Sequence, residues 1–421
     1  MKFLNKIDTS LFKDYALTFL SFTLVGVGNM LIYYFLPIFM TSVDSEIFAV
    51  YKKTSSLLLV ILIGGMGVAI PKFVLENDKE KALLIFFIGF VFSIFITTIA
   101  LFLFLFFPEY FGQILIGKDF LLKDILCLFA IIFSGIINST IYSYFRGIYV
   151  VNKANLLLII ISLLQILFVL ILRDIYIYIV VSSLSIVLIS FSFLFSTSNF
   201  FLQIKRIKIN EFLKFKKIMS YGLLRVPGDF ALEGLTSLPV ILTTSALGIA
   251  MGGQMAYAMT IFGLILAVMS PINFIMLPKV SIAMNIEKDF EKAQKIIKQS
   301  AIIILPLILV TCVVLFFLAD FISSSIFHSN KPIILSKYIR FICFAVLPYS
   351  VYSLLRSVID AWYKYPLNSF NCIISLFVFG VLHFILDSYE NGLLISVLFG
   401  YTYLGFSTYV SYMKIFKKVK C

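Results

Sequence analysis

Three ionisable residues, Arg225, Asp229 and Glu233, recur at intervals of four within the long apolar stretch 219–244. On an α-helix this spacing places them along one side. A charge at the centre of a bilayer costs about 2.5–3.5 kcal/mol on insertion scales, so this side is expected to line a wet cavity rather than face lipid. There the arginine could grip a phosphate, while Asp229 or Glu233 accepts a coupling proton or pairs with the empty site. The spacing leaves open which carboxylate titrates.

Pro227 and Gly228 interrupt the same stretch. Proline has no backbone N–H and its ring crowds the carbonyl of Leu223, so the helix is expected to kink or open at this point. The structural alternative for the charges is that Arg225 extends to the cytoplasmic interface while Asp229 pairs with it to hold the fold.

Further candidate substrate-binding cations lie near the ends of apolar runs. They are Lys52, Lys53, Lys337 and Arg340 at predicted outer ends, and Arg146 and Arg356 at matching inner positions. The first group would form a cationic vestibule for an anionic substrate, and the two arginines an inner phosphate ring, because arginine offers paired donors to phosphate. The alternative is that both groups anchor the chain at the membrane interface and set its topology.

The sequence predicts no metal and no cofactor. His383 stands alone in an apolar run, and the five cysteines are scattered, which favours small buried side chains over metal ligands or disulfides. The phosphate-loop pattern GxxxxGK[ST] is absent, so the chain does not hydrolyse ATP by that route. Transport would instead draw on a gradient, where one charge moved through 100 mV supplies about 2.3 kcal/mol.

The composition is that of an all-α polytopic membrane protein. Hydrophobic residues make up 61% of the 421, and charged residues 13%, against about 25% in soluble domains. A helix crosses the bilayer core with about 20 apolar residues. Twelve spans are predicted, at 15–40, 47–71, 82–107, 121–145, 154–172, 175–203, 219–249, 254–278, 298–320, 335–359, 367–386 and 391–413. The loops between them are too short for an extramembrane domain.

The basic residues set the orientation. Most of the 34 Lys and Arg fall on one side of the membrane if both termini are cytoplasmic, as the positive-inside rule requires. The net charge of +13 is thereby explained without nucleic acid as a partner. The polar N-terminus has no small-residue cleavage site and is expected to stay as part of the first helix.

Two features repeat in the same order at nearly the same separation. Pro71-Lys72 ends the second span and Pro278-Lys279 the eighth, while Tyr142 to Arg146 ends the fourth and Tyr352 to Arg356 the tenth. This argues for duplication. It predicts two six-helix bundles in parallel repeat, residues 1–205 and 219–421, joined by a cytoplasmic linker at 206–218, with the binding cavity between the halves.

The stretch Arg225-Val226-Pro227-Gly228-Asp229-Phe230, preceded by Tyr221-Gly222, resembles Wzx-type oligosaccharide flippases. These belong to the multidrug/oligosaccharidyl-lipid/polysaccharide exporter (MOP) superfamily. The resemblance extends over the whole chain and implies a MATE-like fold around a cationic central cavity. It implies translocation of undecaprenyl-diphosphate-linked repeat units of O-antigen or capsule type across the bacterial inner membrane by alternating access. Other polysaccharide-assembly proteins are then expected partners.

Three other functions compete with this one. A cation-coupled multidrug exporter of the same fold would have an acidic cavity. A membrane glycan polymerase or ligase, an enzyme, would carry a large external loop with catalytic Arg or His. A purely structural scaffold would not need Arg225, Asp229 and Glu233 in a kinked span.

Overall fold

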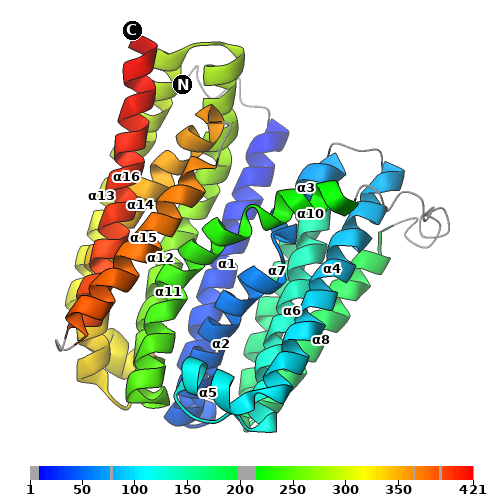
Figure 1. Cartoon of the computed structure of the whole chain (residues 1–421), viewed down its shortest axis with the longest axis vertical. Coiled ribbons are helices and arrows are strands. Elements are labelled where there is room, and N and C mark those ends of the chain that lie inside the picture. The colour runs from blue at the N-terminus through cyan, green and yellow to red at the C-terminus, as the bar shows by residue number, and fades with distance from the viewer. Residues whose placement is uncertain (1–8, 76–78, 198–214, 364–365, 388–390, 421) are drawn as a thin grey trace. The chain divides into compact units, whose positions relative to one another are not determined.

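The computed structural model describes residues 9–75, 79–197, 215–363, 366–387 and 391–420. Within these ranges every regular element is a helix (Figure 1). Among the described residues, ten helices are long and apolar enough to cross a membrane, and one bent pair would make an eleventh. The predicted all-α polytopic class is confirmed, and the apolar helices indicate a multi-pass membrane protein.

The chain divides into two compact units, Met1–Val226 with Ile241–Gly253, and Pro227–Val240 with Gln254–Cys421. The predicted bundle boundaries at 205 and 219 stay a prediction. Of the predicted linker 206–218, residues 206–214 lie outside the described part of the chain.

In the first unit, α6 (Leu122–Gly147) is the central helix. It contacts five neighbours because its buried apolar residues, such as Leu128 and Ile132, recur every three or four positions and give it more than one packing face. Those neighbours are α2 (Ser42–Leu62), α3 (Met66–Leu75), α4 (Lys79–Phe106), α7 (Val151–Ile171) and α8 (Ile175–Phe195). Also in this unit are α1 (Thr9–Phe39), α5 (Pro108–Ile116) and α10 (Phe215–Leu223).

In the second unit, α14 (Pro332–Trp362) is the central helix. It contacts α13 (Phe290–Phe321), α15 (Leu367–Leu386) and α16 (Gly392–Lys420). Gly405 of α16 lies against the backbone of Pro348, where a side chain would clash, so the two helices approach closely. The remaining elements of the second half are α11 (Val226–Leu247), α12 (Ile249–Ser281) and the short π-helical turns Ile282–Ile286 and Ile322–Ile326.

Two predicted segments differ from the structure. The predicted span 47–71 is broken into α2 and α3, which bend by 49° at Gly64-Gly65. Both glycines have positive φ, 60° and 72°, which β-carbon-bearing residues avoid. The predicted loop 108–120 contains α5, which begins at Pro108 and ends at Gly117 in the left-handed conformation.

The predicted span 254–278 lies within α12, whose apolar part Ile249–Ile265 is shorter than a full span within the described residues.

The predicted opening near Pro227 is present. Helix α10 ends at Leu223 and α11 begins at Val226, with two turn residues between them. The Arg225 amide donates to the carbonyl of Gly222 at 3.0 Å, which closes a tight turn. Pro227 falls in the first turn of α11, where a missing N–H breaks no helical hydrogen bond.

Candidate functional site

Arg225 lies over an aromatic ring. Its guanidinium carbon is 5.1 Å from the ring centroid of Tyr221, one turn earlier in the chain. Within the described residues no hydrogen-bond acceptor or carboxylate contacts this guanidinium, so its donors are available to a ligand.

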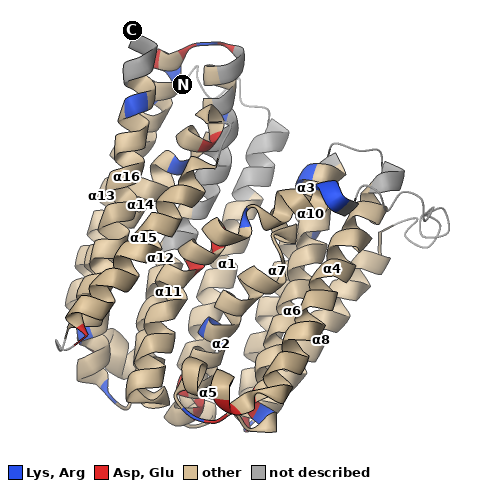
Figure 2. Cartoon of the chain, in the orientation of Figure 1, with Lys and Arg blue, Asp and Glu red and all other residues tan. Residues whose placement is uncertain are grey.

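Cations and rings from α3 and α10 gather around the same place, and we call Lys72, Phe73, Lys217, Tyr221 and Arg225 the α3/α10 cluster. The Lys72 ammonium is 3.9 Å from the Tyr221 centroid, and the Lys217 ammonium is 5.6 Å from the Phe73 centroid. The two rings meet edge to face at 5.6 Å. Figure 2 shows blue residues on α10 and red ones on the first half of α11.

Two glycines bring α3 and α10 this close. A β-carbon on Gly65 would overlap the backbone of Gly222, and one on Gly222 would meet the Gly64 carbonyl and the Met66 side chain. The helices therefore touch backbone to backbone at this level, and the residues one turn along on each helix can share a ring.

The carboxylates of α11 belong to the second unit. Glu233 accepts a hydrogen bond from the Ser237 hydroxyl at 2.8 Å, and it lies near enough to Tyr349 and Tyr401 to interact with them electrostatically. Asp229 interacts in the same way with Cys372 of α15. Both carboxylates are half-buried. The three ionisable residues spaced four apart therefore belong to different units: Arg225 to the first, and Asp229 and Glu233 to the second.

Gly228 fixes α11 against α15. A β-carbon there would overlap the Ser369 side chain, so this end of α11 packs as closely as a helix can. Pro227 marks where α11 begins, and Gly228 allows its close approach to α15.

Lys52 lies between α1 and α2 of the first unit. Its ammonium donates to the Asn29 amide oxygen at 2.7 Å and sits 5.4 and 5.5 Å from the ring centroids of Tyr33 and Phe48. An ammonium has three donors, so two remain for an anion or water. Lys53 is half-buried on the next position of α2.

Arg340 is held within the second unit. It pairs with Asp320 of α13 at 2.5 Å, and its Nε donates to the carbonyl of Phe316 at 3.4 Å. These bonds use two of the five N–H donors of the guanidinium, while Asp320 balances its charge.

Arg146 and Arg356 repeat one local geometry. Each guanidinium lies over the tyrosine one turn earlier, at 5.8 Å from Tyr142 and 6.0 Å from Tyr352. Arg356 also pairs with Asp360 at 3.5 Å. The matching tyrosine–arginine pairs are what a duplicated chain would show.

Sequence reasoning missed Asp124, a fully buried carboxylate. It accepts hydrogen bonds from the Tyr51 hydroxyl at 2.6 Å, the Tyr176 hydroxyl at 3.4 Å and the Leu121 amide at 3.1 Å. The Lys118 ammonium is 3.9 Å away. Its place in the first turn of α6 was a detectable capping signal, but its partners on α2 and α8 were not. Because its carboxylate accepts these hydrogen bonds, Asp124 holds α2 and α8 against the start of α6 and has a structural role.

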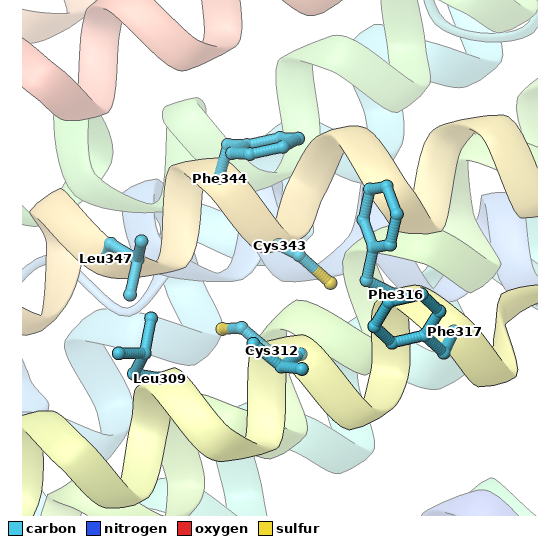
Figure 3. Close-up of a pocket in the computed structure, with 8 residues that line it drawn as sticks. Leu309, Cys312, Phe316, Phe317, Cys343, Phe344 and Leu347 are labelled. Carbon is cyan, nitrogen blue, oxygen red and sulfur yellow. The ribbon is translucent and has the colours of Figure 1, made fainter.

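An apolar pocket of about 200 Å³ opens between α13 and α14 (Figure 3). Phe316, Phe344 and Leu347 line it, with the thiols of Cys312 and Cys343 between the helices. A pocket of hydrocarbon and sulfur suits a lipid chain and offers no donor to a sugar or phosphate. No grouping of three or more His, Cys, Asp or Glu suited to a metal is found among the described residues.

Comparison with known proteins places the fold. No family model matches the chain, and no curated protein sequence matches it. The chain does match solved structures. An inward-facing multidrug resistance MATE family transporter of the MOP superfamily superposes with a TM-score of 0.74 at 14% identity, over 97% of this chain and 95% of that chain.

Two further structures agree. A MOP superfamily transporter from Pyrococcus furiosus gives a TM-score of 0.68 at 12% identity, over 97% and 96% of the two chains. A mutant of the Vibrio cholerae MATE transporter VcmN gives 0.66 at 14%, over 97% and 98%. The protein has the fold of MATE transporters of the MOP superfamily, as the sequence predicted.

Proposed function

We propose that the protein is a flippase for undecaprenyl-diphosphate-linked oligosaccharide repeat units of O-antigen or capsule type. It moves them across the bacterial inner membrane by alternating access, with both termini in the cytoplasm. The observation that carries this proposal is the Arg225 guanidinium, which lies over Tyr221 with its donors unoccupied by any described residue. A paired, planar set of donors is what a diphosphate requires.

The other cations act at different stages of the same passage. Lys52 keeps two donors for an anion, and Lys53 follows it on α2. Arg340 would exchange Asp320 for phosphate, and Arg146 and Arg356 would meet the phosphates at the inner ends of α6 and α14. The polyprenyl tail stays in lipid while the glycan passes through the polar interior.

Asp229 and Glu233 couple the movement to an ion gradient. Both are half-buried on α11, where a charge is costly unless a counter-ion binds it, and Glu233 accepts a hydrogen bond from Ser237. Which of the two titrates is decided by the single variants described below.

A multidrug exporter of the same fold is the second candidate. It is favoured by the structural neighbours described as multidrug resistance transporters and by the acidic side of α11. The P. furiosus neighbour, whose binding pocket of reverse polarity suggests a different function, supports the view that this fold holds pockets of either sign. A glycan polymerase or ligase has no such support.

The test is complementation in a strain that lacks its own flippase and makes the matching repeat unit. Arg225→Ala, at normal membrane levels, is expected to abolish surface polysaccharide, with Arg225→Lys partly active because it keeps the charge but loses the paired donors. Lys279→Ala, an exposed cation of α12, is the matched control and is expected to complement fully. Full activity of Arg225→Ala, or drug resistance in place of polysaccharide, would reject the proposal.

A further inference from the structure

We propose that the α3/α10 cluster is a binding site for the phosphate headgroup of a membrane lipid. Three cations, Lys72, Lys217 and Arg225, surround the two contacting rings of Phe73 and Tyr221. The ligand chemistry is a phosphate carried on an apolar chain, whether an anionic phospholipid or a polyprenyl diphosphate. Only the second of these rests on the proposed flippase function.

The positive charges of Lys72, Lys217 and Arg225 are not neutralised within the described part of the chain. Lys72 and Arg225 approach the same Tyr221 ring, at 3.9 and 5.1 Å from its centroid, so their charges are no farther apart than these two distances together. Like charges at this range repel. Within the described residues none of the three cations has a carboxylate partner. An anion that contacts two of these cations would reduce the repulsion and gain charge-assisted hydrogen bonds.

The cations of the α3/α10 cluster are held in place by the fold before any ligand binds. The close contact of Gly65 with Gly222 fixes α3 against α10, and the turn after Leu223 returns Arg225 to the Tyr221 ring. The rings hold the cations by their faces and leave the N–H groups free to turn outward. Tyr221 and Lys72 are half-buried, so the site is shaped yet open.

The exposed leucines beside these cations indicate a lipid rather than a soluble phosphate. Next to the cations, Leu223 and Leu224 expose 46% and 71% of their surface, while Lys216 and Lys217 are exposed about two turns earlier. A short segment with bare leucines beside lysines is typical of the headgroup boundary, where the leucines enter the acyl layer and the lysines meet phosphate. A soluble anion would make no apolar contact with these leucines, whereas the acyl chains of a lipid would.

The experiment titrates the purified full-length protein with single lipids and measures bound lipid by native mass spectrometry. The probe is phosphatidylglycerol, and diacylglycerol with the same chains is the phosphate-free control. Lys72→Gln/Lys217→Gln is expected to need at least tenfold more phosphatidylglycerol for half occupancy, with unchanged binding of diacylglycerol. Lys279→Gln, which removes an exposed lysine elsewhere, is expected to stay within twofold of the wild type.

Two outcomes would overturn the site: a double variant that holds phosphatidylglycerol as the wild type does, or inorganic pyrophosphate that binds as tightly as the lipid. Equal melting temperatures for the double variant and the wild type ensure that a loss of binding is not a loss of fold. Each substitution keeps most of the side-chain stem, so the packing on the rings is retained.

A second titration with undecaprenyl diphosphate distinguishes the two lipid sources. If the double variant loses undecaprenyl diphosphate and also fails to restore surface polysaccharide, the cluster receives the substrate. If it loses phosphatidylglycerol while polysaccharide is normal, the cluster holds bulk anionic lipid. Both results keep the headgroup site. A wild type that makes no polysaccharide would reject the flippase but leave the lipid titration to stand by itself.

Discussion

The cations of the two units are held in different ways. In the first unit, Lys52, Lys72 and Arg225 lie over aromatic rings. In the second, Lys292, Arg340 and Arg356 pair with carboxylates at 2.7, 2.5 and 3.5 Å, although the two arginines also lie over the rings of Phe316 and Tyr352. A ring positions a cation without cancelling its charge, whereas a carboxylate does both. The first unit therefore retains positive charge at Lys52, Lys72 and Arg225, whereas its Lys118, 3.9 Å from Asp124, is held as the cations of the second unit are.

The ends of α6 and α14 show the same contrast within one repeated feature. Tyr142 and Arg146 match Tyr352 and Arg356 in geometry, and Asp360, one turn after Arg356, pairs with that arginine. The four-residue spacing of tyrosine and arginine thus predicts the local stacking, whereas the pair with Asp360 depends on a residue outside that spacing.

The largest effect is expected from removing both carboxylates of α11. Asp229→Asn/Glu233→Gln should lower gradient-driven transport by more than about 100-fold, equivalent to about 2.7 kcal/mol, because no group is left to carry the coupling ion. Exchange of labelled substrate without a gradient should persist. The single variants show which carboxylate titrates, and unimpaired driven transport in the double variant would remove the second unit from the coupling step.

The next largest effect is expected at Asp124, where a substitution should change the stability of the protein and not its transport activity. Asp124→Asn should lower the free energy of unfolding by about 1–3 kcal/mol, because the hydroxyl of Tyr51 loses a charged acceptor in a fully buried place. Thermal unfolding of the purified protein measures this, with Asp119→Asn, an exposed residue of the loop before α6, as control. Transport per folded molecule should be normal; a specific transport loss would assign Asp124 to the passage.

Tyr221→Leu tests whether a ring is needed where no carboxylate is present. Each cation–π contact is worth about 0.5–1 kcal/mol, so losing the ring under Lys72 and Arg225 should weaken phosphatidylglycerol binding about tenfold. Tyr221→Phe keeps the ring and should bind normally. Equal loss in both variants would mean that the hydroxyl, and not the ring face, is required.

The smallest effect is expected at Arg356. Its pair with Asp360 is about 40% exposed on both sides, so Arg356→Ala should cost about 0.5 kcal/mol of stability. Because each single variant already loses the arginine–carboxylate contact, Arg356→Ala/Asp360→Ala should lie closer to the wild type than additivity predicts, as a thermal double-mutant cycle would show; Asp360 keeps its hydrogen bond from Asn368 in the Arg356 variant. Strict additivity would contradict the pairing.

Much of the fold followed from sequence because hydrophobicity and proline act locally. The apolar runs predicted the helical class, and Pro227 predicted the break before α11. The bend between α2 and α3 was missed, since Gly64-Gly65 lies inside an unbroken apolar run and only its positive φ values end the helix.

The site was predictable only where it is local. The four-residue spacing of Tyr221 and Arg225 is visible in the sequence, although their contact was not among the predictions and forms through the turn after α10. The meeting of Lys72 with Tyr221 joins distant segments and depends on the packing of Gly65 against Gly222, which no local pattern encodes. Asp124 was missed for the same reason, because its hydroxyl donors come from α2 and α8.

The most direct measurement is flipping of a fluorescent undecaprenyl-diphosphate-linked oligosaccharide in proteoliposomes with an imposed ion gradient. The account predicts that the wild type exposes the labelled glycan on the opposite leaflet and that Arg225→Ala, reconstituted to the same level, does not. A wild type that leaves the glycan in place but moves a cationic dye would contradict it.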